Sequence, residues 1–138
     1  MFVGASADGK VVYIEKNLST RHASISRRDV STGVETELYR SSAPAGIFPG
    51  GLSPDGTQFA FLLNPFDDAG PRQILALPVG GGAAKVVHST AHLGSVMSMA
   101  WAPDGRSLIY AESLNDGGKI VAFRDFVNNQ TLAYDDNG

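Results

Sequence analysis

One pattern of residues occurs three times in this chain and constrains its fold more than any other feature. The copies read ASADGKVVYIEK from Ala5, LSPDGTQFAFLL from Leu52 and WAPDGRSLIYAE from Trp101. Measured between the aspartates at 8, 55 and 104, the repeat periods are 47 and 49 residues. Repeats of this length are typical of propeller blades, each of which is a four-stranded antiparallel sheet.

Each copy predicts four strands separated by turns. A first strand precedes each Asp-Gly pair, at about 2–6, 47–53 and 96–102, and a second, apolar strand follows it, at 12–14, 59–61 and 108–110. A third strand is expected from 24, 73 and 120, and a fourth from 34, 83 and 130. Glycine or asparagine recurs between the third and fourth strands, because these residues tolerate the positive φ of tight hairpins.

Helical periodicity is nearly absent from the chain. No window keeps apolar residues at i, i+3, i+4 and i+7 over three turns, and 16 glycines and 7 prolines interrupt the sequence. The predicted fold class is therefore all-β. A Greek-key sandwich is the main alternative, but it gives no reason for four strands to recur with the same turn chemistry at a fixed period. The repeat favours a propeller segment of three blades, at about 1–41, 46–89 and 95–135.

The Asp-Gly turns carry a resemblance to a known family. They read Ser53-Pro54-Asp55-Gly56, Ala102-Pro103-Asp104-Gly105 and, with fewer matching residues, Ser6-Ala7-Asp8-Gly9. This S-P-D-G pattern resembles the TolB-like propeller repeats, which also build the non-catalytic domain of prolyl oligopeptidase-type and tricorn-type proteases. The resemblance covers essentially the whole chain and implies a β-propeller.

A structural role is expected for the turn residues Asp8, Gly9, Asp55, Gly56, Asp104 and Gly105. Proline fixes φ as the chain leaves the first strand, aspartate accepts backbone hydrogen bonds, and glycine takes a conformation that a side chain would oppose. Since Ala7 replaces the proline in the first copy and Ala5 opens it, we expect the first unit to be the most divergent.

Three blades do not close a ring, because propellers close with about four to eight blades. A partial ring leaves apolar sheet faces exposed at both ends. Two solutions fit the sequence. One is a homodimer whose three plus three blades make a six-bladed ring, and the other is a longer chain to which these residues belong. The resemblance favours the homodimer.

Composition argues against several classes of function. The net charge of -3 provides no broad basic surface for nucleic acid, and no segment approaches the roughly 18 consecutive apolar residues of a membrane span. The absence of cysteine excludes disulfides, thiolate catalysis and cysteine-based zinc sites. The first residues, MFVGASADGK, lack the basic start and apolar core of a secretory signal. No export address is therefore expected, although members of the resembling family are often periplasmic, and the compartment stays open.

Binding is expected where the longer links between strands gather. In propellers, the links from second to third strand and from one blade to the next lie on one face, and here they begin near 17, 42, 64, 89 and 113. The candidate binding residues on this open face are Arg21, His22, Asp67, Asp68, Arg72, His92, Asn115 and Asp116.

Metal and nucleophile chemistry are weighed against simpler interpretations. Asp67, Asp68, His92 and Asp116 could converge as ligands, but acidic residues in such loops are usually solvated turn residues, so we predict no metal site and no cofactor. No G-x-S-x-G elbow is present, and an all-β chain lacks the strand-turn-helix that presents such a serine. A hydrolase is therefore not expected.

Two further features have structural interpretations. Trp101 and His88 are expected to pack, Trp101 between blades and His88 within a strand. The run at 80–82 is expected to be a hairpin turn, because a phosphate-binding loop would need a helix after it.

The favoured function is a non-catalytic protein- or peptide-binding scaffold that uses the open face of the completed propeller. It requires no catalytic residues, in agreement with the sequence. The alternatives are a propeller enzyme of the lyase or metal-dependent hydrolase type, and a gating domain of a larger protease. The fold does not identify the ligand, because propeller loops are varied on a generic scaffold.

Overall fold

The computed structural model of this chain describes residues 2–67, 69–89, 95–113, 119–125 and 130–135, and every regular element among them is a strand. The strands of these segments are β1 (Phe2–Ala5), β2 (Val11–Asn17), β3 (His22–Asp29), β4 (Glu35–Leu52), β5 (Gln58–Pro65), β6 (Gln73–Pro78), β7 (Lys85–Ser89), β8 (Ser95–Trp101), β9 (Ser107–Ser113), β10 (Lys119–Asp125) and β11 (Gln130–Asp135). The all-β prediction is confirmed.

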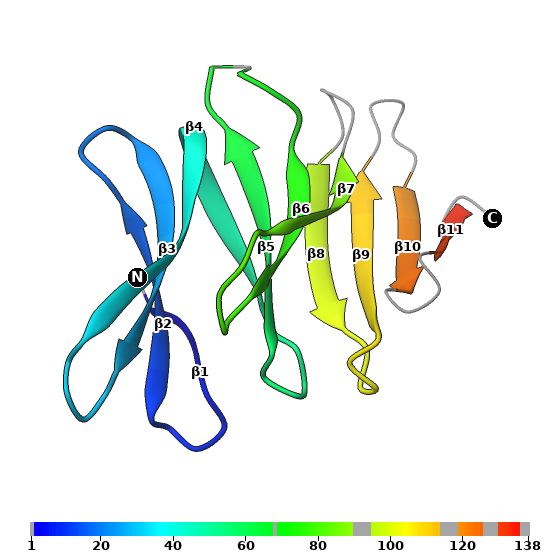
Figure 1. The fold of residues 1–138 in the computed structure, drawn as a ribbon. Helices are drawn as coiled ribbons and strands as arrows, with labels where there is room; N and C mark the ends of the chain where they lie inside the picture. The colour runs from blue at the N-terminus through cyan, green and yellow to red at the C-terminus, as the bar shows by residue number, and fades with distance from the viewer. Residues whose placement is uncertain (1, 68, 90–94, 114–118, 126–129, 136–138) are drawn as a thin grey trace.

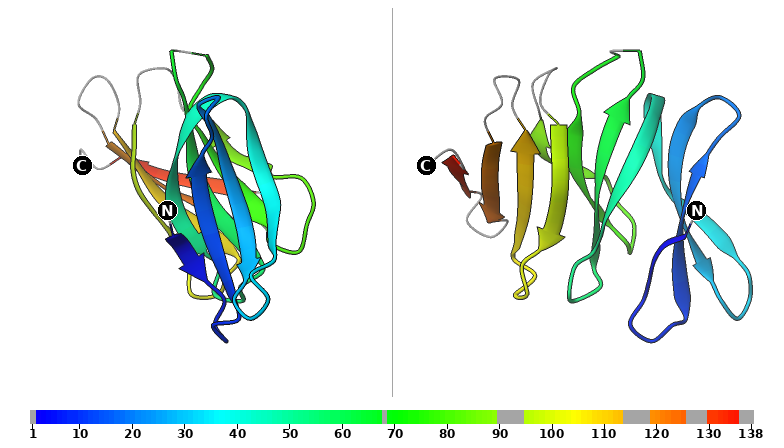
Figure 2. Two further views of the ribbon diagram at one scale, coloured as in Figure 1. Left: turned by 90° about the vertical axis from the view of Figure 1, so that its left-hand side faces the viewer. Right: turned by 180° about the vertical axis from the view of Figure 1, so that it is seen from behind.

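The strands form two antiparallel sheets, a seven-stranded one of β1 to β7 and a four-stranded one of β8 to β11, and together they make three blades in chain order (Figure 1). Blade 1 consists of β1, β2, β3 and the first part of β4, and blade 2 consists of the second part of β4 with β5, β6 and β7. Blade 3 is the sheet of β8 to β11. The right-hand view of Figure 2 shows the blades one after another in a row, with β1 and β11 towards opposite ends. The architecture is a partial β-propeller.

The long strand β4 is the main departure from the predicted strands. The sequence predicted two strands and, between them, a surface link beginning at Ser42, but one 18-residue strand runs through all three. β4 pairs with β3 as far as Pro44 and with β5 from Ala45 onwards. The predicted link is therefore wrong, because the backbone of this segment finds hydrogen-bond partners in two successive blades and stays extended.

Ser41 stabilises the place where β4 passes from blade 1 to blade 2. Its side chain is buried, and its hydroxyl accepts the backbone N–H of Ala23 at 3.0 Å and donates to the carbonyl of Ala43 at 2.7 Å. A buried hydroxyl with both bonds satisfied fixes the backbone on either side of it. The crossing of β4 is thus held rigidly against β3.

The three Asp-Gly turns share one backbone geometry. Their glycines have φ of 70°, 72° and 70° at positions 9, 56 and 105, the left-handed region in which glycine carries no steric cost. Each aspartate accepts the backbone N–H two residues further on, at 3.0, 3.1 and 2.9 Å. The turns therefore reverse the chain between the first and second strand of each blade in the same way.

A serine hydroxyl distinguishes two of these turns from the third. The Oγ atoms of Ser6 and Ser53 each donate to the turn aspartate at 2.6 Å and accept the backbone N–H five residues on at 3.0 Å. Ala102 stands at this place in blade 3 and has no hydroxyl. In its turn chemistry, the first copy is thus closer to the second than the third copy is, contrary to the expectation that it is the most divergent.

The core lies between the blades, and blade 2 is buried on both faces. Between blades 1 and 2, alternate residues of neighbouring strands form one cluster, which consists of Ala23, Ile25, Ala45, Ile47, Phe59, Phe61, Leu63, Leu75 and Leu77. The opposite face of blade 2 packs on blade 3 in a second cluster, which consists of Ala60, Leu62, Ile74, Leu108 and Tyr110. Trp101 packs against this second cluster and donates its Nε1–H to the carbonyl of Gly51 at 3.0 Å, which confirms its predicted role between blades.

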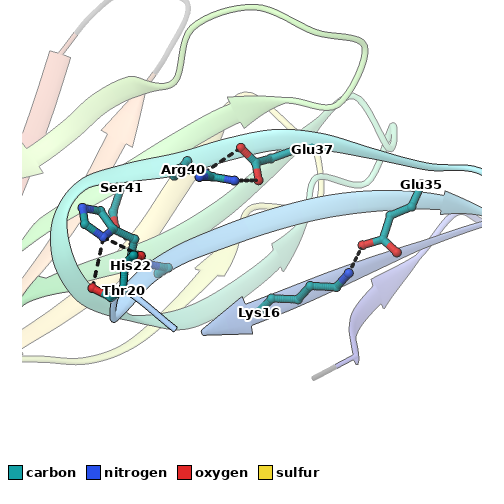
Figure 3. A network of polar contacts seen from close by, with 8 residues as sticks. Lys16, Thr20, His22, Glu35, Glu37, Arg40 and Ser41 are labelled. Atoms are coloured by element: carbon teal, nitrogen blue, oxygen red, sulfur yellow. Dashed lines mark hydrogen bonds and ion pairs between the residues drawn. The ribbon is translucent and has the colours of Figure 1, made fainter. Parts of the chain in front are cut away.

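The outer face of blade 1 is charged. Cross-strand neighbours form what we call the charged end face, Lys16, Arg28, Glu35, Glu37 and Arg40. Glu35 forms ion pairs with Lys16 and, at 3.0 Å, with Arg28. Glu37 binds Arg40 through two bonds of 2.8 and 3.0 Å, and Figure 3 shows this pair beside that of Lys16 and Glu35. Each of these five charged side chains is therefore ion-paired within blade 1.

The outer face of blade 3 differs in chemistry. The described side chains there include Ile109, which is 36% exposed, and its strand neighbours Ala100 and Ala111. These residues line a shallow hollow of about 320 Å³. The described part of this face is therefore largely apolar, unlike the charged end face of blade 1.

Candidate binding site

Two links that were predicted to lie on one face do lie together. The β2–β3 and β5–β6 links are found at the upper end of the blades in Figure 1, and the Asp-Gly turns at the lower end. The crossing segment of β4 passes between the two links and bonds to both. Ala45 donates its N–H to the carbonyl of Arg21 at 3.2 Å, and Phe66 donates to the carbonyl of Pro44 at 2.9 Å. These backbone bonds set the distance between the links.

The rim of the site is formed by Arg21, Phe66 and Asp67. The Arg21 guanidinium carbon lies 4.9 Å from the centre of the Phe66 ring, and its Nη1 lies 3.4 Å from Asp67 Oδ2. Arg21 and Asp67 have φ of 64° and 56°, which is uncommon for residues other than glycine. Because both charged side chains are largely exposed, the ion pair adds little stability, about 0–1 kcal/mol, and its main effect is to orient the arginine.

Below this rim lies a pocket of about 300 Å³ between blades 1 and 2. It is lined by Glu15, Asn17, Leu18, Arg21, Gly46, Ile47, Phe48, Asn64 and Phe66. Glu15 is only 5% exposed, and its burial raises the pKa of its carboxyl above the ordinary value of 4.5. The pocket therefore combines a buried carboxyl group with amide and aromatic walls.

Three of the predicted binding residues belong to this neighbourhood. Arg21 and Asp67 form the rim, and Arg72 donates its Nε–H at 3.0 Å to Oδ1 of Asn64, a lining residue. His22 is directed elsewhere, with its Nδ1 3.0 Å from Oγ1 and 3.2 Å from the carbonyl oxygen of Thr20 (Figure 3). His22 is therefore not a member of the pocket.

The remaining predicted binding residues, Asp68, His92, Asn115 and Asp116, lie outside the described residues. Within the described part of the chain, no three histidine or acidic side chains gather in a way that could hold a metal ion. The same part contains no helix with the length and apolarity of a membrane span.

Sequence reasoning missed Glu15, Asn17 and Asn64, although the repeat carries a signal for each. Glu15 stands seven residues after its turn aspartate, where the other copies have Leu62 and Ala111. An acidic residue at a position that is apolar in the other two blades indicates a function specific to blade 1. Asn17 and Asn64 both stand nine residues after the aspartate, so asparagine is the last residue of the second strand in one copy and the next to last in another.

A second polar contact joins blades 2 and 3. His88 of β7 lies 3.0 Å from Glu112 of β9 through its Nε2, and its ring packs on Tyr110 with centroids 4.8 Å apart. His88 is thus a packed strand residue, as predicted. The contact closes the seam between the two blades and lies apart from the pocket.

The fold and the site define a segment of a β-propeller with a side-chain-sized pocket at one end of its blades. No protein-family model and no curated protein matches the chain. Solved structures do match. Putative TolB from Agrobacterium tumefaciens is 21% identical with a TM-score of 0.68, and the alignment covers 97% of this chain and 48% of that one.

Two further structures have the same fold. An oligogalacturonate lyase in complex with manganese is 16% identical, with a TM-score of 0.74 and coverage of 96% of this chain and 40% of that one. The β-propeller domain of the Trilobed protease from Pyrococcus furiosus is 15% identical, with a TM-score of 0.67 and coverage of 97% and 42%. These likenesses support, at the level of the fold, the resemblance to TolB-like propellers. The chain spans less than half the length of each of these three structures.

Proposed function

We propose that this chain is part of a β-propeller that binds a protein or peptide segment and has no catalytic role of its own. The observation that carries the proposal is the pocket between blades 1 and 2 with its rim of Arg21, Phe66 and Asp67. Arginine and aromatic side chains are enriched among the residues that contribute most to protein binding. The backbone bonds that fix the two links keep this site in one geometry before a partner arrives, which lowers the entropic cost of binding.

A peptide-binding experiment with two arginine variants tests the proposal. Fluorescence polarisation would measure binding of the whole chain to labelled pools of randomised twelve-residue peptides. Arg21→Ala is expected to weaken the binding about tenfold, because it removes the arginine side chain from the rim. Arg106→Ala is the matched control, since Arg106 is also exposed but lies in the Asp-Gly turn of blade 3, at the other end of the blades. Absence of binding, or an equal loss in both variants, would contradict the proposal.

The homodimer expected from the sequence is part of the same proposal. A two-fold ring would place the apolar outer face of blade 3 against the charged end face of the partner. Such an obligate interface buries more than about 2,000 Å² in total, so a thermal midpoint that rises with protein concentration is expected. Light scattering across a dilution series measures the mass of the particle in solution and so distinguishes a dimer from a monomer. A dimer mass supports ring closure by two copies, and a monomer mass assigns closure to other blades.

An enzymatic role is the alternative, because the neighbours include a lyase crystallised with manganese and the propeller domain of a protease. In that case this chain would supply a metal site or a gating domain of a larger protein. Isothermal titration of the whole chain with Mn²⁺ tests the first version. Stoichiometric binding would favour the lyase-like alternative over a binding scaffold.

A further inference from the structure

The pocket between blades 1 and 2 has a definite chemical character, which narrows the partner proposed above. Its charged lining residues are Glu15 and Arg21. Arg21 stands at the mouth, where it is 62% exposed, lies over Phe66 and is paired with Asp67. Glu15 lies in the wall and is 5% exposed. The mouth therefore has compensating charges, while the interior is acidic.

The walls near Glu15 suit an aliphatic chain. Leu18, Ile47 and Phe66 supply apolar lining. Phe48 also borders the pocket, but it stands opposite Leu62, which packs on blade 3, so its side chain points to the other face of β4. The Phe66 ring lies against β4 at Gly46, where a Cβ atom would be in ordinary contact with the ring at 3.6 Å. Long basic side chains lie along apolar surfaces of this kind while their charged heads reach polar groups.

The size of the pocket also limits the ligand. A volume of about 300 Å³ lies at the lower end of the range of ligand pockets, which is roughly 300–1,000 Å³. It suits one side chain rather than a cofactor. Asn17 adds an amide carbonyl oxygen, which accepts hydrogen bonds from a cation as a carboxylate does, whereas Oδ1 of Asn64 already accepts a bond from Arg72.

We propose that this pocket binds the side chain of one lysine or arginine residue of a bound peptide, with the cation at Glu15 and the aliphatic stem along Leu18 and Phe66. The proposal rests on the peptide-binding function proposed above. An anionic side chain is disfavoured, because it would approach the Glu15 carboxylate in a buried site where like charges repel strongly.

Four peptide pools test this specificity with the whole chain. Each pool consists of twelve-residue peptides with eleven randomised positions and one fixed central residue. The fixed residue is lysine, arginine, glutamate or norleucine, the uncharged analogue of lysine. Binding of the lysine or arginine pool is expected to be about tenfold tighter than binding of the norleucine pool, the size of one charge-assisted hydrogen bond. The glutamate pool is expected to bind most weakly.

Two isosteric variants locate the preference. Glu15→Gln is expected to abolish the difference between the lysine and norleucine pools while keeping the binding of the norleucine pool. Glu112→Gln is the matched control, because Glu112 is similarly buried at 6% exposure but lies at the seam between blades 2 and 3, and it should keep the preference. Circular dichroism of both variants checks that they fold.

Each result has one interpretation. A preference that is lost only in Glu15→Gln supports the proposal. A glutamate preference, equal binding of all pools, or a lysine preference that survives in Glu15→Gln overturns it and leaves the general peptide-binding function intact. Absence of binding to every pool overturns both.

Discussion

Replacing Ser53 by alanine should destabilise this chain by about 1–3 kcal/mol, the usual cost of leaving a buried backbone donor without its acceptor. Ser53 is 4% exposed, and its Oγ accepts the N–H of Gln58 at 3.0 Å and donates to Asp55 at 2.6 Å. Gln58 begins β5, which supplies Phe59 and Phe61 to the core. The loss of stability therefore arises at the start of β5, the second strand of the central blade.

Blade 3 offers the reverse experiment within the same molecule. Ala102 stands where Ser53 stands in blade 2, and the backbone frame is the same, since each residue donates its N–H to a carbonyl five residues on at 2.8 Å. Asp104 is in place to accept a hydroxyl, as Asp55 does. Ala102→Ser is therefore expected to stabilise the chain by about 0.5–1.5 kcal/mol, the net value of one added hydrogen bond.

Urea unfolding followed by circular dichroism, at one fixed protein concentration, measures both variants and the double variant. The Ser53→Ala midpoint should fall and the Ala102→Ser midpoint should rise. An unchanged midpoint for Ser53→Ala, or a lowered midpoint for Ala102→Ser, would refute the hydrogen-bond argument. A titration of Asp55 by NMR gives a second readout. The Ser53 hydroxyl is the largest cause that lowers the pKa of Asp55 below 3.8, so this pKa should rise in Ser53→Ala.

Three further outcomes are expected from thermal or urea unfolding. Because the Glu15 pKa is raised, the carboxyl binds more protons in the native state than in the unfolded state, and the stability of the chain falls as pH rises from 4.5 through the raised pKa. Glu15→Gln should thus stabilise the chain near pH 7 but not below pH 4.5. A difference in stability between the two proteins that does not change with pH would contradict this. Phe61→Ala should lower the free energy of unfolding by about 3–5 kcal/mol because Phe61 is fully buried, and Ile109→Ala should lower it by less than about 1 kcal/mol because Ile109 is exposed. Equal losses of stability would mean that the outer face of blade 3 is covered. Gly56→Ala should cost roughly 1–2 kcal/mol from its φ of 72° alone, since no atom lies within 4 Å of the added Cβ, and an unchanged midpoint would contradict a left-handed turn.

The fold followed from the sequence because local and global signals agree in this chain. The Asp-Gly turns, the apolar strands after them and the repeat period all predicted the same four-stranded unit, and the structure has it. The continuity of β4 was missed because the middle of its sequence has the composition of a link, in which Pro44 and Gly46 are typical of turns. Pairing with two different blades overrides that local preference, and no local pattern reports it.

The site was predictable only in part. Arg21, Asp67 and Arg72 were found because polar residues in long links are natural candidates. Glu15 lies within a strand, so whether it lines the pocket depends on which face of β2 is turned towards blade 2. The pairing of Glu15 with Ile25, a residue of the cluster between blades 1 and 2, determines that face. Phe66 was missed because its role depends on a backbone bond to β4, 22 residues earlier in the chain.

The passage of β4 through two blades has a consequence for how the chain opens. A propeller blade that shares no strand with its neighbour can unfold separately from it. Here the first two share one continuous backbone, so unpairing of β3 from β4 loosens the edge on which β5 rests. Blades 1 and 2 should exchange their amide hydrogens as one cooperative unit, with similar protection on β3 and β5. Two repeats in the sequence would then be a single unit in unfolding.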